Sequence, residues 1–284
     1  MSAASKKKIV VTKASGKQVP FLPGKLMQSL TRSGADAATV NAITNTVAAE
    51  TYDGITTHEI YRKAFRLLRS HARHEAARYK LKQAIMELGP SGYPFELYAG
   101  KVFEHLGYKV KSGVFVKGEC VKHEVDIVGE NENRLVFGEC KFHNKPGLKC
   151  DVKVPLYVHS RFRDIENRYQ KQPETTGKKH EGWVITNTHF STDAIHYANC
   201  AGLNLLGWDY PAGNALKNII DNAGLHPLTC LTTLKITEKQ FLLNHQIVLS
   251  SELIHQPGVL KQAGIDAKRK EQLIVEIEGL CQKK

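Results

Sequence analysis

The spacing of hydrophobic and polar positions divides the chain into three regions, of which the first spans residues 9–89. It opens with two short strands, expected over 8–13 and 18–21 and joined by a polar turn. Apolar positions then recur at helical spacing, and Gly89 with Pro90 ends the last helix. Helices are expected from near Pro23 and over 36–51, 57–70 and 72–88. The pattern predicts a small, mostly helical domain with a β-hairpin at its start.

In the second region, residues 92–228, strands alternate with helices after a predicted linker at 91–94. An amphipathic helix is expected over 95–106 and ends at Gly107. Strands are predicted at 108–116, 120–128, 134–142, 182–186 and 203–208, and further helices at 151–169 and 191–201. This alternation is typical of an α/β sandwich with helices on both faces of a sheet.

The third region, residues 235–284, is again helical in pattern. Breaks at 256–258 and 263–266 divide it into two or three pieces. The whole chain is therefore expected to be α/β in class, with a helical domain first and a small helical region last.

From the composition we expect the protein to be located in the cytoplasm. The chain is 42% hydrophobic and 24% charged, as in ordinary globular proteins. No apolar run approaches the roughly 20 residues that cross a bilayer, so no membrane partner is expected. Residues 1–8 form a basic tail without the apolar core of a signal peptide. The six cysteines lack paired spacing, which favours reduced thiols and gives no local sign of zinc.

The balance of charge points to a polyanionic partner. The formal net charge is +12 and the isoelectric point is near 9.3. A basic surface binds phosphates with release of counterions, so nucleic acid is one candidate partner. Many basic proteins bind no nucleic acid specifically, and the charge alone decides nothing further.

Three charged residues interrupt the strand pattern between residues 120 and 142. The period of two places Glu139 and Lys141 on one face, and the turn near 129–133 brings Asp126 close to Glu139. Two carboxylates can share Mg²⁺ or Mn²⁺, while the lysine assists a nucleophile or stabilises charge on a phosphate. The alternative is an ordinary salt bridge on an edge strand.

The order of elements around these residues resembles the PD-(D/E)xK nuclease core, in the restriction-endonuclease-like branch related to Mrr. The resemblance covers 92–228 and implies that Glu96, Asp126 and Glu139 bind the metal and that Lys141 assists catalysis. Val125 stands where the family's proline usually does. His143 follows Lys141 closely, and we interpret it as a local polar residue rather than a phosphate ligand.

A second constellation lies at the start of the chain. A turn containing Gly16 is flanked by Lys13, Lys17 and Lys25, which together offer amide and ammonium groups to phosphates. A basic hairpin without a ligand is the alternative from spacing alone.

This constellation resembles the opening of an ATP-cone, a regulatory nucleotide-binding domain, over 9–89. The resemblance rests on Val11, Lys13 and Gly16, on Lys25 twelve residues after Lys13, and on the segment 52–57. It implies that these residues, with Lys17 and Thr57, bind ATP or dATP as an effector that is not hydrolysed. Ala14 replaces the family's usual arginine, which leaves the choice between ATP and dATP open.

Residues 260–270 faintly resemble a helix-hairpin-helix, and a helical oligomerisation appendage is the alternative. Taken together, the sequence predicts a Mg²⁺-dependent endodeoxyribonuclease regulated by ATP or dATP, acting on DNA and forming a homo-oligomer. RNA is the alternative substrate. The competing function is a nucleotide-sensing regulator that binds nucleic acid through a non-catalytic nuclease fold.

Overall fold

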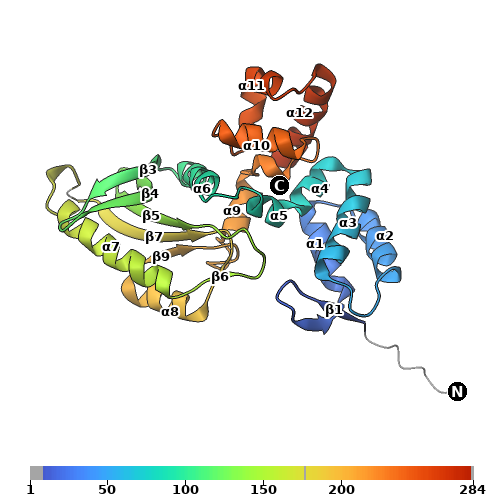
Figure 1. The fold of residues 1–284 in the computed structure, drawn as a ribbon, viewed down its shortest axis with the longest axis horizontal. Coiled ribbons are helices and arrows are strands. Elements are labelled where there is room, and N and C mark those ends of the chain that lie inside the picture. The colour runs from blue at the N-terminus through green and yellow to red at the C-terminus, as the bar shows by residue number, and fades with distance from the viewer. Residues whose placement is uncertain (1–8, 176, 283–284) are drawn as a thin grey trace.

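The computed structural model describes residues 9–175 and 177–282. A helical N-terminal domain, a mixed α/β domain and a group of C-terminal helices follow one another along the chain (Figure 1). This architecture confirms the predicted α/β class. The predicted basic tail, residues 1–8, lies outside the described residues.

The N-terminal domain begins with an antiparallel pair of short strands, β1 (Val10–Thr12) and β2 (Gln18–Pro20). Five helices follow: α1 (Pro23–Ser33), α2 (Ala37–Ala49), α3 (Thr57–His71), α4 (Arg73–Tyr79) and α5 (Leu81–Met86). The single helix expected over 72–88 is wrong, because the chain turns at Lys80 between α4 and α5. The Lys80 ammonium donates to Glu87 and to the carbonyl of Thr229, which holds this turn against the C-terminal region.

The α/β domain contains a five-stranded sheet of order β3-β4-β5-β7-β9. Strands β3, β4 and β5 pair antiparallel, whereas β5, β7 and β9 pair parallel. These strands are β3 (Lys109–Lys117), β4 (Lys122–Glu130), β5 (Arg134–Lys141), β7 (Lys179–Thr186) and β9 (Asn204–Leu206). A separate parallel pair is formed by β6 (Lys149–Cys150) and β8 (His189–Phe190).

Helices cover both faces of the sheet. On one face α6 (Tyr93–His105) and α9 (Leu216–Ala223) pack, and on the other α7 (Lys153–Tyr169) and α8 (Thr192–Ala201). The predicted linker at 91–94 is wrong at its end, because Tyr93 and Pro94 already form the first turn of α6. Proline suits this position, since its fixed φ is helical and its missing N–H would have no helical partner. Helix α9 was not predicted.

The C-terminal region packs against the α/β domain rather than standing apart. Its elements are η2 (Leu228–Cys230), α10 (Ile236–Asn244), η3 (Ser251–His255), α11 (Pro257–Gln262) and α12 (Ala267–Cys281). Their apolar residues share one hydrophobic core with residues of α5, α6 and α9. Across residues 9–175 and 177–282, every helix is too short or too polar to cross a bilayer.

Candidate functional site

Asp126 lies where β4 and β5 separate. The β4–β5 ladder begins at the pair Ile127–Gly138, and one residue earlier the Asp126 carboxylate accepts a 2.7 Å hydrogen bond from the Cys140 amide. Opposite Asp126 on β3, Gly113 has φ of 61°, a conformation that favours glycine. The strand changes face here, and the Asp126 carboxylate is held at the end of β5.

Glu139 and Lys141 lie next to it on β5. Glu139 projects to the face covered by α7, whereas Cys140 packs into the core under α6. The strand period of two gives Lys141 the same face as Glu139. The carbonyl of Lys141 accepts a 2.7 Å hydrogen bond from the Thr186 hydroxyl, which fixes the end of the strand. The Lys141 side chain is exposed, and its positive charge offsets a small part of the increase that burial causes in the pKa of Asp126 and of Glu139. The predicted charged set therefore converges at this end of the sheet.

Glu96 reaches the same place from the first turn of α6. Burial, followed by the charges of Asp126, Glu139 and Glu124, raises the pKa of Glu96 to about 7. Burial and the charge of Asp126 also raise the pKa of Glu139 to about 7. Burial raises the pKa of Asp126 as well, against the lowering effect of the Cys140 hydrogen bond. The carboxylates are thus close enough to repel one another.

Two charged residues of the site were not predicted. Arg161 of α7 donates a 2.5 Å hydrogen bond to Glu139 and a second one, of 2.8 Å, to the carbonyl of Glu124. Arg161 lies between Val158 and Phe162, which are buried, so the helical spacing could have indicated a cation at the edge of the apolar face of α7. Glu124 lies two residues before Asp126 in β4, where the strand period could have indicated a further acid.

The donors at this site suit a hard divalent cation. Glu96, Asp126 and Glu139 supply carboxylate oxygens only, the ligand type that Mg²⁺ prefers, and their mutual repulsion would be relieved by a cation. Within the described residues, however, no three His, Cys, Asp or Glu side chains are grouped tightly enough to hold a metal. Arg161 instead provides the positive charge beside Glu139. The residues fit the cation chemically, but their side chains must move together to bind it.

The raised pKa of Glu96 predicts a pH-dependent stability of the metal-free protein. An acid with a higher pKa in the folded state than in the unfolded state binds more protons when folded. Stability is therefore lost as pH rises from the ordinary value near 4.5 toward about 7. In EDTA at about pH 8, we expect Glu96→Gln to increase the free energy of unfolding by about 1 kcal/mol, after discounting for solvent screening.

Urea denaturation at about pH 5 and about pH 8 measures this effect. Glu104→Gln, an exposed substitution on the same helix, is the matched control and should change little at either pH. Equal stability of Glu96→Gln and the wild type at the higher pH would show that the carboxylate carries no electrostatic cost.

A second pocket lies between β1, β2 and helices of the N-terminal domain. Its volume is about 240 Å³, and it is lined by Val11, Lys13, Val19, Pro20, Phe21, Leu22, Lys25, Leu26, Ser29, Thr57, Ile60, Tyr61 and Tyr79. Two stacked rings, Tyr61 and Tyr79, have centroids 5.2 Å apart. Burial raises the pKa of Tyr79 to about 12, so this phenol is neutral at ordinary pH. The pocket combines apolar and aromatic walls with two exposed lysines.

Backbone hydrogen bonds bring Thr57 to this pocket. The segment before α3 binds β1 through the amide of Thr12, which donates to the carbonyl of Ile55, and through the amide of Val10, which donates to Asp53. Thr56 and Glu59 then form a capping box that starts α3. Four predicted nucleotide-binding residues thus meet here: Val11, Lys13, Lys25 and Thr57.

Gly16 and Lys17 lie outside this lining. They belong to the turn after β1, where the Lys13 amide donates to the Lys17 carbonyl and Gly16 has φ of 78°. Because the pocket is smaller than the 300–1,000 Å³ typical of small-molecule sites, a bound triphosphate would have to extend beyond it. Gly16 and Lys17 are both exposed, so they would be accessible to phosphates that extend beyond the pocket.

His143 has local hydrogen-bond partners. Its amide donates to the Asn187 side chain over 2.8 Å, its carbonyl accepts from the same side chain, and Nδ1 lies 3.0 Å from the Thr188 hydroxyl. These bonds anchor the start of the loop between β5 and β6. Farther along the loop, Gly147 approaches Ser15 in the turn after β1. The loop therefore extends from the carboxylate site toward the N-terminal hairpin (Figure 1).

Comparisons with known proteins place most of the chain in one family. Residues 226–281 match the family model described as AF1548-like, C-terminal. An uncharacterized protein of Archaeoglobus fulgidus is 31% identical over 176 residues, which make up 62% of this chain and 95% of that protein. The crystal structure of AF1548, a protein of unknown function, is similar with a TM-score of 0.55 and 29% identity, over 67% of this chain and 98% of that one.

A more distant similarity is found to the MspJI restriction endonuclease in complex with a 27-mer oligonucleotide. Its TM-score is 0.35 at 16% identity, over 70% of this chain and 39% of that one, which is too remote to bear on function. The nearly full coverage of the Archaeoglobus protein, by contrast, makes the assignment secure. The chain belongs to the AF1548-like family.

Proposed function

We propose that this protein is a metal-dependent nuclease that hydrolyses phosphodiester bonds of DNA and is regulated by ATP or dATP. The observation that carries the proposal is the convergence of Glu96, Asp126 and Glu139 beside the exposed Lys141. Burial raises the pKa of all three acids, and the charge of Asp126 raises those of Glu96 and Glu139 further. Such clusters of perturbed acids are characteristic of functional sites. An ordinary surface salt bridge would not place three partly buried acids together.

Each residue has a role in this proposal. Glu96, Asp126 and Glu139 would hold Mg²⁺ or Mn²⁺. The bound cation would acidify a water and offset negative charge on the phosphate. Lys141, free to move at the end of β5, would donate to the attacking water or to a phosphate oxygen. Arg161 would release Glu139 and keep its hydrogen bond to the Glu124 carbonyl.

The proposed effector site is the pocket containing Lys13, Lys25 and Thr57. The lysines would bind phosphates, and the apolar and aromatic walls would contact the base. Gly147 lies near Ser15, which offers a route by which a change in this hairpin could reach the loop that follows Lys141. We infer that nucleotide binding changes this loop or the contacts between copies of the chain, and so the cleavage rate.

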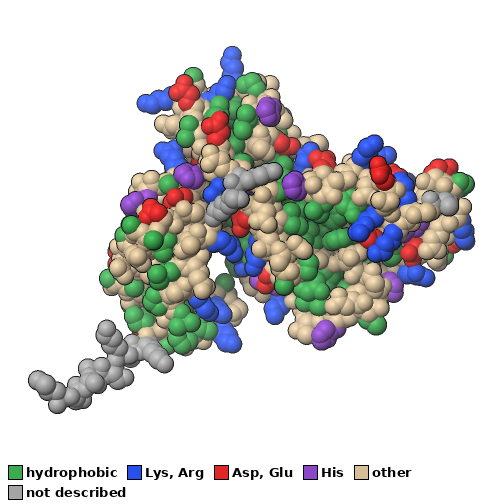
Figure 2. Space-filling model, turned by 180° about the vertical axis from the view of Figure 1, so that it is seen from behind, with side chains coloured by type: hydrophobic (Ala, Val, Ile, Leu, Met, Phe, Trp, Pro, Cys, Tyr) green, Lys and Arg blue, Asp and Glu red, His purple; other side chains and the backbone are tan. Residues whose placement is uncertain are grey.

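The distribution of positive charge is consistent with a nucleic-acid substrate. Lys and Arg side chains gather on both sides of the hollow between the N-terminal domain and the α/β domain (Figure 2). A basic cleft raises the local concentration of a polyanion.

The test is incubation of the full-length protein with supercoiled plasmid, linear duplex DNA or RNA, with Mg²⁺ or EDTA, and with or without ATP or dATP. We expect cleavage of DNA only with the metal, at a rate that the nucleotide changes. Binding of DNA without cleavage of any substrate would favour the alternative, a nucleotide-sensing regulator with a non-catalytic nuclease fold. Preferential cleavage of RNA would correct the substrate.

A further inference from the structure

The outer face of α3 carries a row of cations that neither the carboxylate site nor the nucleotide pocket uses. Its members recur every one to three residues along α3, namely Arg62, Lys63, Arg66 and Arg69, and Arg73 in the first turn of α4 extends the row. The opposite side, with Ile60, Ala64 and Leu68, is buried in the N-terminal core. Because burial of that apolar face holds α3 in place, the four arginines are presented to solvent.

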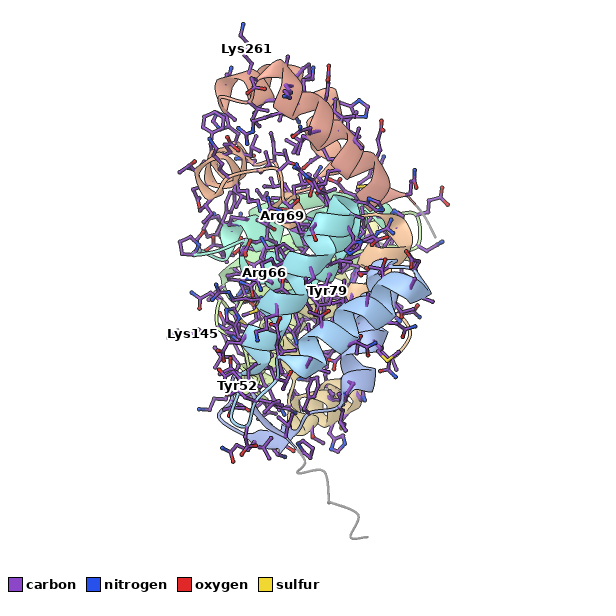
Figure 3. The ribbon with its side chains drawn as sticks, turned by 90° about the vertical axis from the view of Figure 1, so that its right-hand side faces the viewer. Tyr52, Arg66, Arg69, Tyr79, Lys145 and Lys261 are labelled. Atoms are coloured by element: carbon purple, nitrogen blue, oxygen red, sulfur yellow. The ribbon has the colours of Figure 1, made fainter. Side chains whose placement is uncertain are left out.

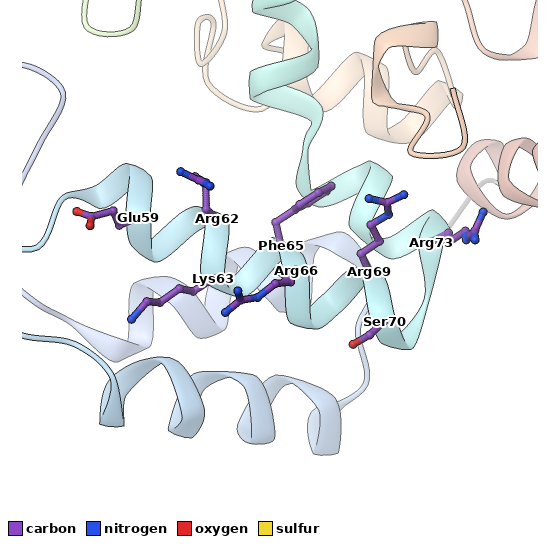
Figure 4. A pocket seen from close by; sticks show the side chains of 8 residues that line it. All are labelled: Glu59, Arg62, Lys63, Phe65, Arg66, Arg69, Ser70 and Arg73. Carbon is purple, nitrogen blue, oxygen red and sulfur yellow. The ribbon is translucent and has the colours of Figure 1, made fainter. Parts of the chain in front are cut away.

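These cations line a groove of about 730 Å³, together with Glu59, Phe65 and Ser70 (Figure 4). Among the residues that the structure describes, Glu59 is the single acid of the lining, and the start of α3 already uses its carboxylate. It accepts hydrogen bonds from the amide and hydroxyl of Thr56 and from the hydroxyl of Tyr52. The groove is therefore strongly positive, with its only negative charge turned to the helix cap.

Neighbouring acids neutralise little of this charge. Lys63 pairs with Glu50 over 3.1 Å. Arg69 and Arg73 donate to neutral oxygens, the Thr232 carbonyl and the Thr233 hydroxyl, respectively. Over the part of the chain that the structure describes, Arg62 and Arg66 have no carboxylate within ion-pair distance.

The length of the row decides which anion fits it. From Arg62 to Arg69, α3 advances about 10 Å, and Arg73 lies beyond its end in α4. The row is therefore too long for the three adjoining phosphates of one nucleotide. One strand of duplex DNA presents a phosphate about every 3.4 Å along its axis, so about four would lie along the α3 part of this row. An acidic protein would need an apolar centre among the charges, and the lining offers only Phe65.

We propose that the basic face of α3 binds the phosphodiester backbone of duplex DNA, so that the N-terminal domain holds the substrate as well as the effector. The choice of DNA rests on the proposed function. Arg66 and Arg69 lie toward the same side of the molecule as Lys145, four residues after Lys141 (Figure 3). A duplex bound to this side of the molecule would therefore also face the loop that follows the carboxylate site.

Binding is measured by fluorescence anisotropy with a labelled duplex of roughly 30 base pairs, longer than α3, in EDTA so that cleavage plays no part. The full-length wild type is compared with Arg62→Ala/Arg66→Ala, which spares the hydrogen bonds of Arg69 and Arg73. Lys109→Ala/Lys111→Ala removes the same charge from exposed positions of β3 and is the matched control. Thermal unfolding establishes that each variant is folded, and an RNA duplex of equal length is a second probe.

We expect the α3 variant to bind DNA on the order of tenfold more weakly, with a salt slope smaller by about two. The β3 control should retain wild-type affinity. Wild-type binding by the α3 variant, or an equal loss in the β3 control, would overturn the inference, and a loss confined to RNA would overturn the choice of duplex DNA. Cleavage is assayed separately with Mg²⁺. DNA binding that depends on α3, without cleavage, would therefore support this inference and contradict the proposed nuclease activity.

Discussion

Asp126→Asn is expected to reduce the rate of DNA cleavage by roughly 10²–10⁴-fold. The amide keeps the size of the carboxylate, and its oxygen can still accept the hydrogen bond from the Cys140 amide, so the ends of β4 and β5 should keep their conformation. What is lost is one negative charge facing Glu96 and Glu139. The variant should therefore fold normally and bind Mg²⁺ weakly.

The cleavage rate is measured with excess enzyme over plasmid, and Mg²⁺ binding by calorimetry, for the same preparations. Asp193→Asn, an exposed acid in the first turn of α8, is the matched control and should cleave like the wild type. If Asp126→Asn cleaves DNA at the wild-type rate, the site described here is not the catalytic one.

Lys13→Ala/Lys25→Ala is expected to weaken ATP and dATP binding by at least about 100-fold. Each lysine is exposed at the pocket and offers one charge-assisted hydrogen bond to a phosphate, worth about 1.5–3 kcal/mol. The lysines stabilise little else, so the domain should remain folded. Cleavage by this variant should proceed without any response to the nucleotide.

Nucleotide affinity is measured by calorimetry with each nucleotide, and the response by cleavage assays with and without it. The Lys109→Ala/Lys111→Ala variant should bind and respond normally. If the double variant still binds ATP with wild-type affinity, this pocket is not the site that binds the regulatory nucleotide. That conclusion would hold whether or not the protein cleaves DNA.

Local patterns predicted the type and order of most elements, because apolar spacing and glycine or proline breaks act within one segment. The period of two predicted that Glu139 and Lys141 share one face of β5, and the structure places Glu139 on the face that α7 covers. Other boundaries depended on distant contacts. The turn at Lys80 is held by a hydrogen bond to the Thr229 carbonyl, about 150 residues later in the chain. No sequence pattern around residue 80 indicates that partner.

The candidate site was predictable in its acids but not in its cation or geometry. Asp126, Glu139 and Lys141 follow from one hairpin and Glu96 from the order of elements. Arg161 reaches Glu139 only because α7 packs across that end of the sheet. Similarly, Gly147 of one domain lies near Ser15 of another, and this proximity cannot be inferred from either segment alone.

The nuclease proposal is tested most directly by the cleavage of supercoiled plasmid with Mg²⁺ by the wild type and by Lys141→Ala. Lys141 is exposed and contributes no core packing, so its loss should leave the fold and DNA binding intact. We expect nicked or linear plasmid from the wild type, no product in EDTA, and a rate at least roughly 100-fold lower for the variant. Equal cleavage by the two proteins, or none by the wild type with any metal and nucleotide, would contradict the proposal.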